Sequence, residues 1–309
     1  MNFFKPNFWD KNQISFFSIL LFPLTLLINF LVLLKSLTTK KNKFSIPIIC
    51  IGNLYLGGTG KTPLSIEVFK ILKNLKKDPV FIRKKYISHQ DEVNLQEQFG
   101  KVFQSTKRVN AISNAVLSNA NIVIMDDGFQ DFSINKNLSI LCFNEKLWIG
   151  NGFTIPSGPL RENLSSLQRA NCVMINGNKN INIEKEILKR NSKIKIFYTK
   201  YNAENINMFK GKKITAFAGI GNPESFFQLL KYNKINIVKE IKFPDHYTYS
   251  DKELENLCSN SKNNNTLLLT TEKDYFRINK KYKNNINCLK ISVEIENKEQ
   301  FINEIRKII

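Results

Sequence analysis

The longest apolar stretch of the chain lies near its N-terminus. Between Asn12 and Leu34 no residue is charged, and most of the 23 positions are Leu, Ile or Phe. About 20 such residues suffice for a helix to cross a bilayer. Pro23 and Asn29 interrupt the stretch, and it lacks the small-residue cleavage site of a signal peptide. The pattern predicts a retained helix that spans a membrane or lies in its interface, with a buried core helix as the alternative.

Basic residues flank this stretch. Residues 1–50 contain one acid, Asp10, and six lysines, most of them just after the apolar positions: Lys5, Lys11, Lys35, Lys40, Lys41 and Lys43. Positive charge next to a membrane helix marks the cytoplasmic side. We therefore expect the chain beyond Leu34 to lie on the cytoplasmic face of a membrane.

Short apolar runs alternate with helical or turn-rich segments in the rest of the chain. A buried strand is predicted at 46–51, then a Gly-rich turn and a helix at about 62–75. Further strands are predicted at 80–82, 122–125, 138–143, 172–175, 213–218 and 267–270, and a further helix at 223–230. This alternation is typical of an α/β fold with a mainly parallel sheet.

The turn after the first strand has the composition of a phosphate-binding loop, Gly57-Gly58-Thr59-Gly60-Lys61-Thr62. Glycines let backbone N–H groups surround phosphates, the lysine neutralises phosphate oxygens, and the hydroxyl binds Mg²⁺. The usual pattern has glycine where this chain has Tyr55. We assign ATP binding to Tyr55, Leu56, Gly57, Gly58, Thr59, Gly60, Lys61 and Thr62. The alternative is a Gly-rich turn without function.

A second motif follows the predicted strand at 122–125, which ends in Asp126-Asp127-Gly128. In phosphate-loop enzymes an acid at the end of a neighbouring strand binds Mg²⁺ directly or through water. Asp-Asp-Gly is also an ordinary turn sequence. Together with the loop, it predicts a magnesium site made of Thr62, Asp126 and Asp127.

These patterns predict a P-loop NTPase-like fold with three parts. Residues 1–43 form the apolar membrane-anchoring helix and its basic flank, 44–205 the P-loop core domain, and 206–309 a second, smaller α/β domain. The pattern of strand, helix and strand restarts near residue 200, but no Pro-rich or Ser-rich linker marks the boundary.

The formal net charge of +20 suits a partner rich in phosphate, such as nucleic acid, an anionic membrane or a phosphorylated substrate. A bias towards lysine and asparagine along the whole chain is the other explanation, since the charge forms no single basic tract. No nucleic-acid recognition motif is present, so we expect no nucleic-acid partner. Five widely spaced cysteines and two histidines, His89 and His246, exclude a zinc motif and favour a reducing compartment.

Six motifs occur in order along the chain. They are the N-terminal apolar helix, the phosphate loop, Asp126-Asp127-Gly128-Phe129-Gln130, Pro156-Ser157-Gly158-Pro159-Leu160-Arg161-Glu162, Phe243-Pro244-Asp245-His246-Tyr247 and Thr270-Thr271-Glu272-Lys273-Asp274. In these motifs the chain resembles the tetraacyldisaccharide 4′-kinase family of lipid A biosynthesis. The resemblance covers nearly the whole chain. It implies transfer of the ATP γ-phosphate, with Mg²⁺, to the 4′-hydroxyl of a tetraacylated glucosamine disaccharide 1-phosphate, giving lipid IVA at the cytoplasmic face of a Gram-negative inner membrane. It implies no protein partner.

The resemblance also implies roles for single residues. Asp91 corresponds to the general base, His246 to its partner and Lys61 to the catalytic lysine of the loop, whereas Arg161 and Glu162 correspond to positions that contact the lipid. From the residues alone, Asp91 is better explained as a solvated acid at a helix start and His246 as a satisfied core or turn histidine. A surface ion pair is the alternative explanation of Arg161 and Glu162.

Three positions depart from the family pattern. The segment Arg83-Lys84-Lys85-Tyr86-Ile87 lacks the glycines of a Ser-Arg-Gly-Tyr-Gly-Arg sequence, Asp131 replaces a histidine and Val93 replaces a proline. A membrane-associated ATPase of the partitioning type is the main alternative function. Those proteins have a lysine where this chain has Leu56, and the later motifs have no place in them.

Overall fold

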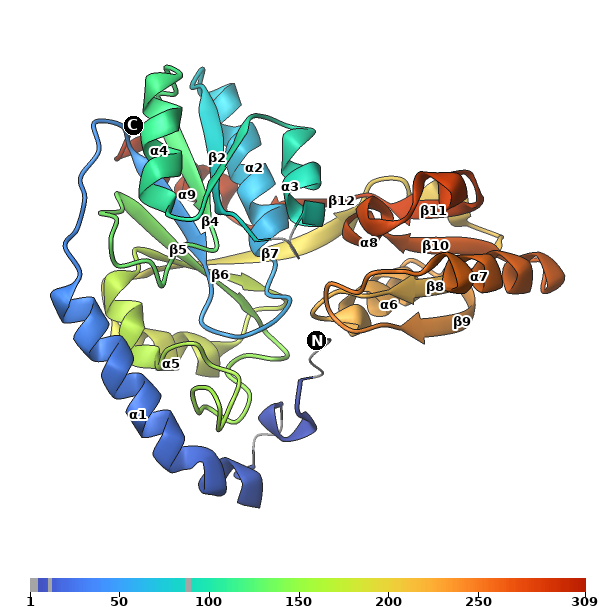
Figure 1. The fold of residues 1–309 in the computed structure, drawn as a ribbon, viewed down its shortest axis with the longest axis horizontal. Helices are drawn as coiled ribbons and strands as arrows, with labels where there is room; N and C mark the ends of the chain where they lie inside the picture. Colours follow the sequence, from blue (N-terminus) through green and yellow to red (C-terminus); the bar gives the residue numbers. More distant parts are fainter. Residues whose placement is uncertain (1–4, 11–12, 87–89) are drawn as a thin grey trace. The chain divides into compact units, whose positions relative to one another are not determined.

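The computed structural model describes residues 5–10, 13–86 and 90–309 (Figure 1). Lys11 and Asn12 of the predicted N-terminal segment, and Ile87 and His89, lie outside the described residues. The described residues form two compact units. The large unit comprises, within the described residues, 5–85, 99–200 and 294–309, and the small unit comprises 86–98 and 201–293.

An eight-stranded sheet forms the centre of the large unit (Figure 1). Its strands lie in the order β12-β7-β6-β5-β1-β4-β2-β3, and the pairs from β7 to β3 are parallel. The strands are β1 (Ile48–Gly52), β2 (Pro79–Lys84), β3 (Val102–Ser105), β4 (Ile122–Asp126), β5 (Leu138–Asn144), β6 (Cys172–Asn176), β7 (Lys195–Ala203) and β12 (Ile291–Ile295). A parallel sheet is covered on both faces, and β1, β4 and β5 are accordingly buried at every position. The predicted parallel α/β fold is confirmed.

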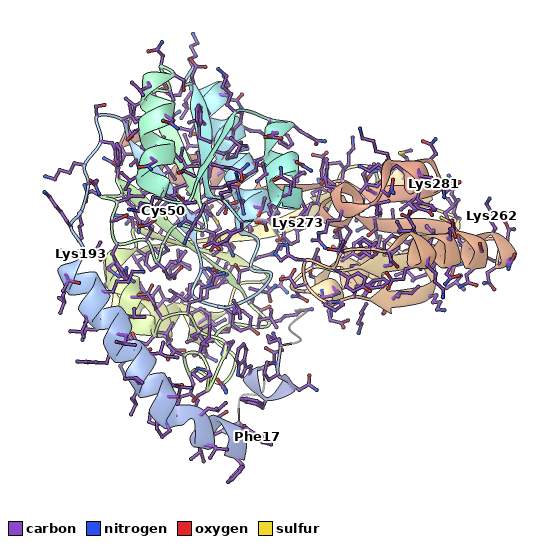
Figure 2. The ribbon with its side chains drawn as sticks, in the orientation of Figure 1. Phe17, Cys50, Lys193, Lys262, Lys273 and Lys281 are labelled. Atoms are coloured by element: carbon purple, nitrogen blue, oxygen red, sulfur yellow. The ribbon has the colours of Figure 1, made fainter. Side chains whose placement is uncertain are left out.

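Helices cover this sheet and enclose its core. They are α2 (Lys61–Asn74), α4 (Arg108–Leu117), α5 (Ile181–Arg190) and α9 (Lys298–Arg306), with the 3₁₀ turns η1 (Asn7–Trp9) and η3 (Leu164–Arg169). Cys50 of β1 lies in the interior, where burial raises the pKa of its thiol to about 11 (Figure 2). It therefore acts as a small apolar residue, in agreement with the absence of a cysteine motif.

The small unit has a four-stranded parallel sheet in the order β11-β10-β8-β9. Its strands are β8 (Lys213–Ala218), β9 (Asn236–Lys242), β10 (Leu267–Thr271) and β11 (Ile286–Leu289). Its helices are α3 (Gln90–Glu97), α6 (Pro223–Tyr232), α7 (Asp251–Asn263) and α8 (Glu272–Arg277), with the turns η4 (Ile206–Phe209) and η5 (Lys280–Asn285). The predicted second α/β unit is therefore present.

The bounds of the units differ from the predicted division between residues 205 and 206 in three segments. Residues 201–205 belong to the small unit. Residues 86–98 belong to the small unit because α3 packs against α8. Residues 294–309 belong to the large unit, where Phe301 of α9 is fully buried and its ring centroid lies 5.3 Å from that of Phe197. The chain passes between the units within β7 and β12 as well as around α3.

Helix α1 (Phe16–Thr38) lies within the predicted N-terminal segment, and the side chain of Ser15 caps its first turn. Among the described residues it is the one helix long and apolar enough to cross a membrane, and only 11% of that span is buried. Phe17, labelled in Figure 2, is one of its many exposed apolar side chains. The alternative of a buried core helix is therefore wrong.

A polar stripe fastens α1 to the large unit. The Thr25 hydroxyl lies 2.8 Å from Ser157 Oγ, Thr154 Oγ1 donates to Asn29 Oδ1 at 3.0 Å, and Asn151 Nδ2 donates to Ser18 Oγ at 3.1 Å. The three helix residues are separated by seven and four positions and so lie on one face. The opposite face of α1 is apolar and exposed.

Gly52, the last residue of β1, offers a test of how tightly the large core is packed. A Cβ atom at this position would lie 2.5 Å from Cβ of Phe129, which is itself buried. We expect Gly52→Ala to lower the free energy of unfolding by about 1–3 kcal/mol, as overpacking does in closely packed cores. Urea unfolding followed by circular dichroism measures this. The control is Ser113→Ala on the exposed side of α4, and equal stability of the two variants would contradict the prediction.

Candidate functional site

The predicted phosphate loop connects β1 to α2. Gly57 has φ 132° and Gly60 has φ 91°, backbone conformations that L side chains rarely adopt. Gly60 is the N-cap of α2, and Lys61 is the first residue of that helix. The helix N-terminus directs unpaired N–H groups and a partial positive charge at whatever the loop holds. The loop therefore has the backbone geometry that phosphate binding requires.

Buried hydrogen bonds hold the loop in this shape. Asn53, which is fully buried, donates through Nδ2 to the Tyr55 carbonyl at 2.5 Å and to Thr59 Oγ1 at 3.0 Å. The backbone of Leu56 donates to the Pro159 carbonyl at 2.8 Å, and that of Arg161 donates to the Leu54 carbonyl at 2.6 Å. The motif that ends in Arg161 and Glu162 is thus the structural support of the phosphate loop.

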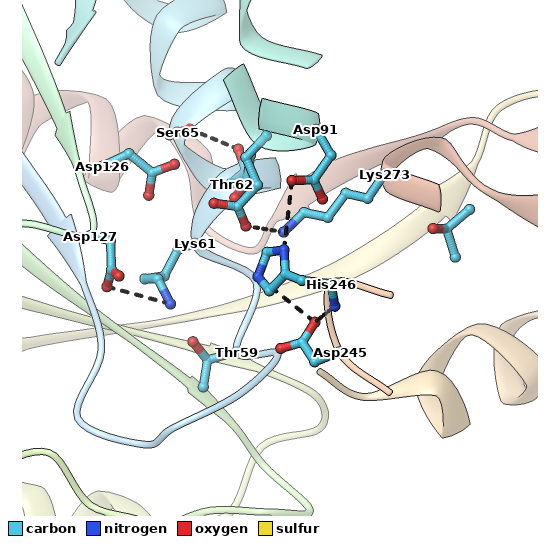
Figure 3. A network of polar contacts seen from close by, with 12 residues as sticks. Thr59, Lys61, Thr62, Ser65, Asp91, Asp126, Asp127, Asp245, His246 and Lys273 are labelled. Atoms are coloured by element: carbon cyan, nitrogen blue, oxygen red, sulfur yellow. Dashed lines mark hydrogen bonds and ion pairs between the residues drawn. The ribbon is translucent and has the colours of Figure 1, made fainter. Parts of the chain in front are cut away.

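Asp127 brings three of the predicted residues together in the large unit. Its Oδ1 lies 3.6 Å from Lys61 Nζ (Figure 3). The same oxygen accepts a hydrogen bond from Arg161 Nη1 at 2.7 Å. Asp127 has φ 53°, a conformation in which Asp is more common than most residues, and its N–H donates to the Ile51 carbonyl at 2.8 Å. The turn therefore holds this carboxylate at the carboxyl end of β1.

Asp126, the other predicted magnesium ligand, forms an ion pair with Arg83 at the end of β2. Both side chains are almost inaccessible to solvent, 0% exposed for Asp126 and 5% for Arg83. In the sequence, Arg83 stands out only as part of a segment that departs from the family pattern. Its function in the structure is to neutralise a buried carboxylate, which would otherwise be strongly unfavourable.

Glu162 is buried, in contrast to the surface ion pair that was one explanation of its position. It pairs with Arg169, whose guanidinium centre lies 4.5 Å from the ring centroid of Phe129. Burial raises the pKa of Glu162, although the charge of Arg169 opposes this effect. Arg161 keeps a partly exposed side chain, so of the two residues it is the one nearer to solvent.

Asp131, which replaces a histidine of the family pattern, contacts two nearby side chains through its carboxylate. Asp131 Oδ2 lies 3.4 Å from Nη1 of Arg108, and Arg108 also donates to the Asp127 carbonyl at 2.6 Å. Ser133 donates to the same carboxylate through its hydroxyl at 2.6 Å. Arg108 therefore holds the turn that contains Asp127.

A second group of predicted residues lies within the small unit. Asp91 is on α3, and its Oδ1 lies 3.6 Å from Nδ1 of His246, which follows β9 (Figure 3). His246 has φ 55°, and its N–H donates to the Gly219 carbonyl at 3.1 Å. The pair that the family resemblance implies is therefore assembled, and Asp91 is buried and not a solvated acid at a helix start.

Arg277 of α8 holds the other oxygen of Asp91. Its Nε and Nη2 atoms donate to Asp91 Oδ2 at 2.9 and 2.7 Å, and its Nη1 lies 3.1 Å from Oδ1 of Asp274. Asp274 is fully buried and also accepts hydrogen bonds from the Gly219 N–H and the Tyr249 hydroxyl. Arg277 was missed in the sequence, although an acid and an arginine three residues apart on a helix are a recognisable signal.

These contacts set the ionisation of Asp91. Burial alone would raise its pKa, but the nearby imidazole of His246 and the charge of Arg277 outweigh burial and lower the pKa to about 2. The contribution of ionised Asp91 to stability is therefore present above its ordinary pKa near 3.8 and is lost as the pH falls towards 2.

Lys273 and Asp245 complete the small-unit group. Lys273, matched in the sequence without a role, forms an ion pair with Glu92 of α3, the neighbour of Asp91. Asp245, which precedes His246 in the same motif, lies with Oδ1 at 3.9 Å from His246 Nε2. The structure thus assembles the predicted residues in two groups, one in each unit, and their chemical roles remain predictions.

Arg277 offers a test of the electrostatics around Asp91. We expect Arg277→Met to raise the Asp91 pKa from about 2 towards its ordinary value, because the neighbouring positive charge is lost. Arg277→Lys keeps the charge without the guanidinium fork and should give a pKa between the two. Carboxyl resonances of ¹³C-aspartate, assigned with Asp91→Asn, measure the midpoint. Arg306→Met, an exposed arginine on α9, is the control, and an unchanged midpoint in both Arg277 variants would contradict the prediction.

Comparison with known proteins identifies the family. The family model described as tetraacyldisaccharide-1-P 4′-kinase matches residues 17–309. The tetraacyldisaccharide 4′-kinase of Pelagibacter ubique is 41% identical over 98% of both chains, and that of Rickettsia akari is 32% identical over 98% of this chain and 96% of its own. The crystal structure of LpxK from Aquifex aeolicus in complex with ATP shares the fold, with a TM-score of 0.72, 24% identity, and coverage of 94% of this chain and 99% of that one. The chain belongs to the tetraacyldisaccharide 4′-kinase family.

Proposed function

We propose that this protein transfers the γ-phosphate of ATP to the 4′-hydroxyl of a tetraacylated glucosamine disaccharide 1-phosphate and so forms lipid IVA in lipid A biosynthesis. The observation that carries the proposal is the family match over residues 17–309, which includes the phosphate loop and every later motif. The alternative, a partitioning ATPase, leaves those later motifs without a function.

The large unit binds the nucleotide in this proposal. The backbone from Tyr55 to Thr62 surrounds the phosphates, and Lys61 neutralises the oxygens of the transferred group. The Aquifex aeolicus protein was crystallised in complex with ATP, the nucleotide that this loop would hold. Arg161, already hydrogen-bonded to Asp127, adds a second cation beside Lys61.

The donor atoms of the loop and of β4 fit Mg²⁺. The Thr62 hydroxyl and the carboxylates of Asp126 and Asp127 are oxygen ligands, which Mg²⁺ prefers. The described residues contain no cluster of three or more His, Cys, Asp or Glu side chains that could hold a metal. This agrees with an ion that uses one or two carboxylates together with nucleotide phosphates. When bound, Mg²⁺ would neutralise charge that develops on the transferred phosphoryl group.

Asp91 and His246 take the proton of the sugar hydroxyl. As the oxygen of the 4′-hydroxyl forms its bond to the γ-phosphorus, the bond to the leaving ADP oxygen breaks and the O–H proton passes to the pair. We assign Asp91 as the base and His246 as its partner. An aspartate with a pKa of about 2 is a weak base alone. The 3.6 Å approach of His246 Nδ1 therefore matters, because the imidazole can share the proton.

Arg161 and Glu162 are proposed to contact the lipid substrate. The guanidinium of Arg161 matches the geometry of a phosphate or sugar oxygen pair. Glu162 belongs to the same motif and would contact the lipid from its buried position next to Arg169. Burial raises the pKa of its carboxyl group.

Helix α1 is proposed to lie in the membrane interface on the cytoplasmic face of the inner membrane. Its polar stripe of Ser18, Thr25 and Asn29 binds the large unit, which leaves the apolar face for acyl chains. The lysines after the helix suit anionic lipid headgroups. We expect neither nucleic acid nor a protein partner to take part.

Phosphate transfer tests the activity and the assigned base together. We expect Lys61→Ala to lower the rate of ³²P transfer from Mg-ATP to the disaccharide 1-phosphate in detergent micelles by roughly 10²–10³-fold. Asp91→Asn should lower it by about 10²–10⁴-fold. Lys73→Met, at an exposed ion pair on α2, is the control. Hydrolysis of ATP without lipid phosphorylation would contradict the proposed activity, and full activity of Asp91→Asn would contradict the assigned base.

Membrane association is tested on the exposed face of α1. We expect Leu20→Gln together with Leu27→Gln to release the protein from phosphatidylglycerol vesicles, because both side chains are exposed and apolar and the change adds no charge. Vesicle sedimentation measures the bound fraction. Leu117→Gln, on an exposed position of α4, is the control. Equal binding of the two variants would show that α1 does not carry the association.

A further inference from the structure

Tyr55 is an unusual residue for its place in the phosphate loop, where most such loops have glycine. Its side chain is fully buried. Its backbone is part of the loop scaffold, since its carbonyl accepts from Asn53 and it bridges to Leu160. A movement of the Tyr55 side chain would therefore move the backbone of the loop.

The hydroxyl of Tyr55 contacts the segment that precedes α1, residues Lys5–Asp10, which we call the arm. It donates to Oδ1 of Asp10 and accepts from Nζ of Lys5 at 2.7 Å. Lys5 also forms an ion pair with Asp10 at 2.6 Å, and its ammonium lies 4.9 Å from the Tyr55 ring centroid. A buried tyrosine hydroxyl requires partners of this kind.

The arm is packed on the large unit. Trp9 is 3% exposed, and its Nε1 donates to the Pro156 carbonyl at 3.1 Å. The Trp9 carbonyl accepts from the Asn151 N–H at 2.9 Å. A Cβ atom at Gly150 would lie only 2.2 Å from the same carbonyl oxygen. The arm thus binds both the loop and the 150–160 segment that supports the loop.

We propose that Tyr55 is a positioning residue that links the arm to the phosphate loop, so that the affinity for ATP depends on the docking of the arm. The inference rests on the proposed function, which places ATP in the loop and α1 at the membrane. Since α1 follows the arm in the chain and is fastened to Thr154 and Ser157 of the same supporting segment, the arm joins the lipid-facing helix to the nucleotide site. None of the six family motifs includes Lys5 or Asp10.

The contact between the arm and the loop can be removed at the Tyr55 hydroxyl without changing the packing of the Tyr55 ring. Tyr55→Phe removes both hydrogen bonds and keeps the ring, whereas Asp10→Asn removes the charge that accepts from the hydroxyl. A hydrogen bond to a charged group is stronger than one between neutral groups, so its loss should be measurable.

Nucleotide binding tests the proposal independently of phosphate transfer. We expect Tyr55→Phe and Asp10→Asn each to raise the Kd of a fluorescent ATP analogue about tenfold for the full chain in detergent micelles, which corresponds to about 1.4 kcal/mol. The double variant should bind about as weakly as either single variant, because each single variant already breaks the hydrogen bond between Tyr55 and Asp10. For Asp10→Asn, which lies outside the loop, the KM for ATP should rise, while kcat at saturating ATP and the KM for lipid stay unchanged. Lys73→Met is the control.

Three results would overturn the proposal. They are unchanged ATP affinity in both single variants, additive losses in the double variant, and an equal loss with Lys73→Met, which would indicate general destabilisation. Failure of the proposed function is distinguishable, because the native chain would then bind ATP without phosphorylating the lipid.

Discussion

The parallel pairing of β1 with β4 is the constraint on which the large-unit site depends. Both strands are buried along their whole length, and Ile51 pairs with Asp126. Parallel neighbours end at the same edge of a sheet, where ligands of open α/β sheets bind. The loop after β1 and Asp127 after β4 therefore meet, with 3.6 Å between Lys61 Nζ and Asp127 Oδ1. The apolar packing of β1 and β4 thus brings the polar side chains of Lys61 and Asp127 together.

Buried carboxylates in both units are balanced by arginines. Asp126 pairs with Arg83, Asp91 with Arg277 and Glu162 with Arg169. A buried charge without a partner is strongly unfavourable, so the loss of either partner of these pairs would destabilise the fold. The effect on the pKa of the carboxyl group differs between Asp91 and Glu162. His246 and Arg277 overcome burial at Asp91 and lower its pKa, whereas burial prevails at Glu162 and raises its pKa. Similar ion pairs thus give carboxylates of different proton affinity.

Local patterns in the sequence predict the strands and the phosphate loop, because continuous apolar runs and glycines act over a few residues. The run of uncharged residues predicts the helix within residues 1–43 but does not reveal that Ser15 is the cap at which it begins. Long-range partners were missed for a related reason. Glu92 and Lys273 are separated by 181 positions, as Asp91 and Arg277 are by 186, and nothing in α3 alone indicates that it packs on α8.

Two departures from the expected motifs show how a chain retains a site with different residues. At Asp131, which replaces a histidine of the family pattern, Arg108 and Ser133 bind the carboxylate and hold the turn of Asp127. At Tyr55, which replaces the glycine of the usual loop, Lys5 and Asp10 bind the hydroxyl. In each case the new polar group has partners that its burial requires. A substitution inside a motif therefore has to be judged together with the residues that it contacts, because these contacts decide whether the backbone of the motif keeps its place.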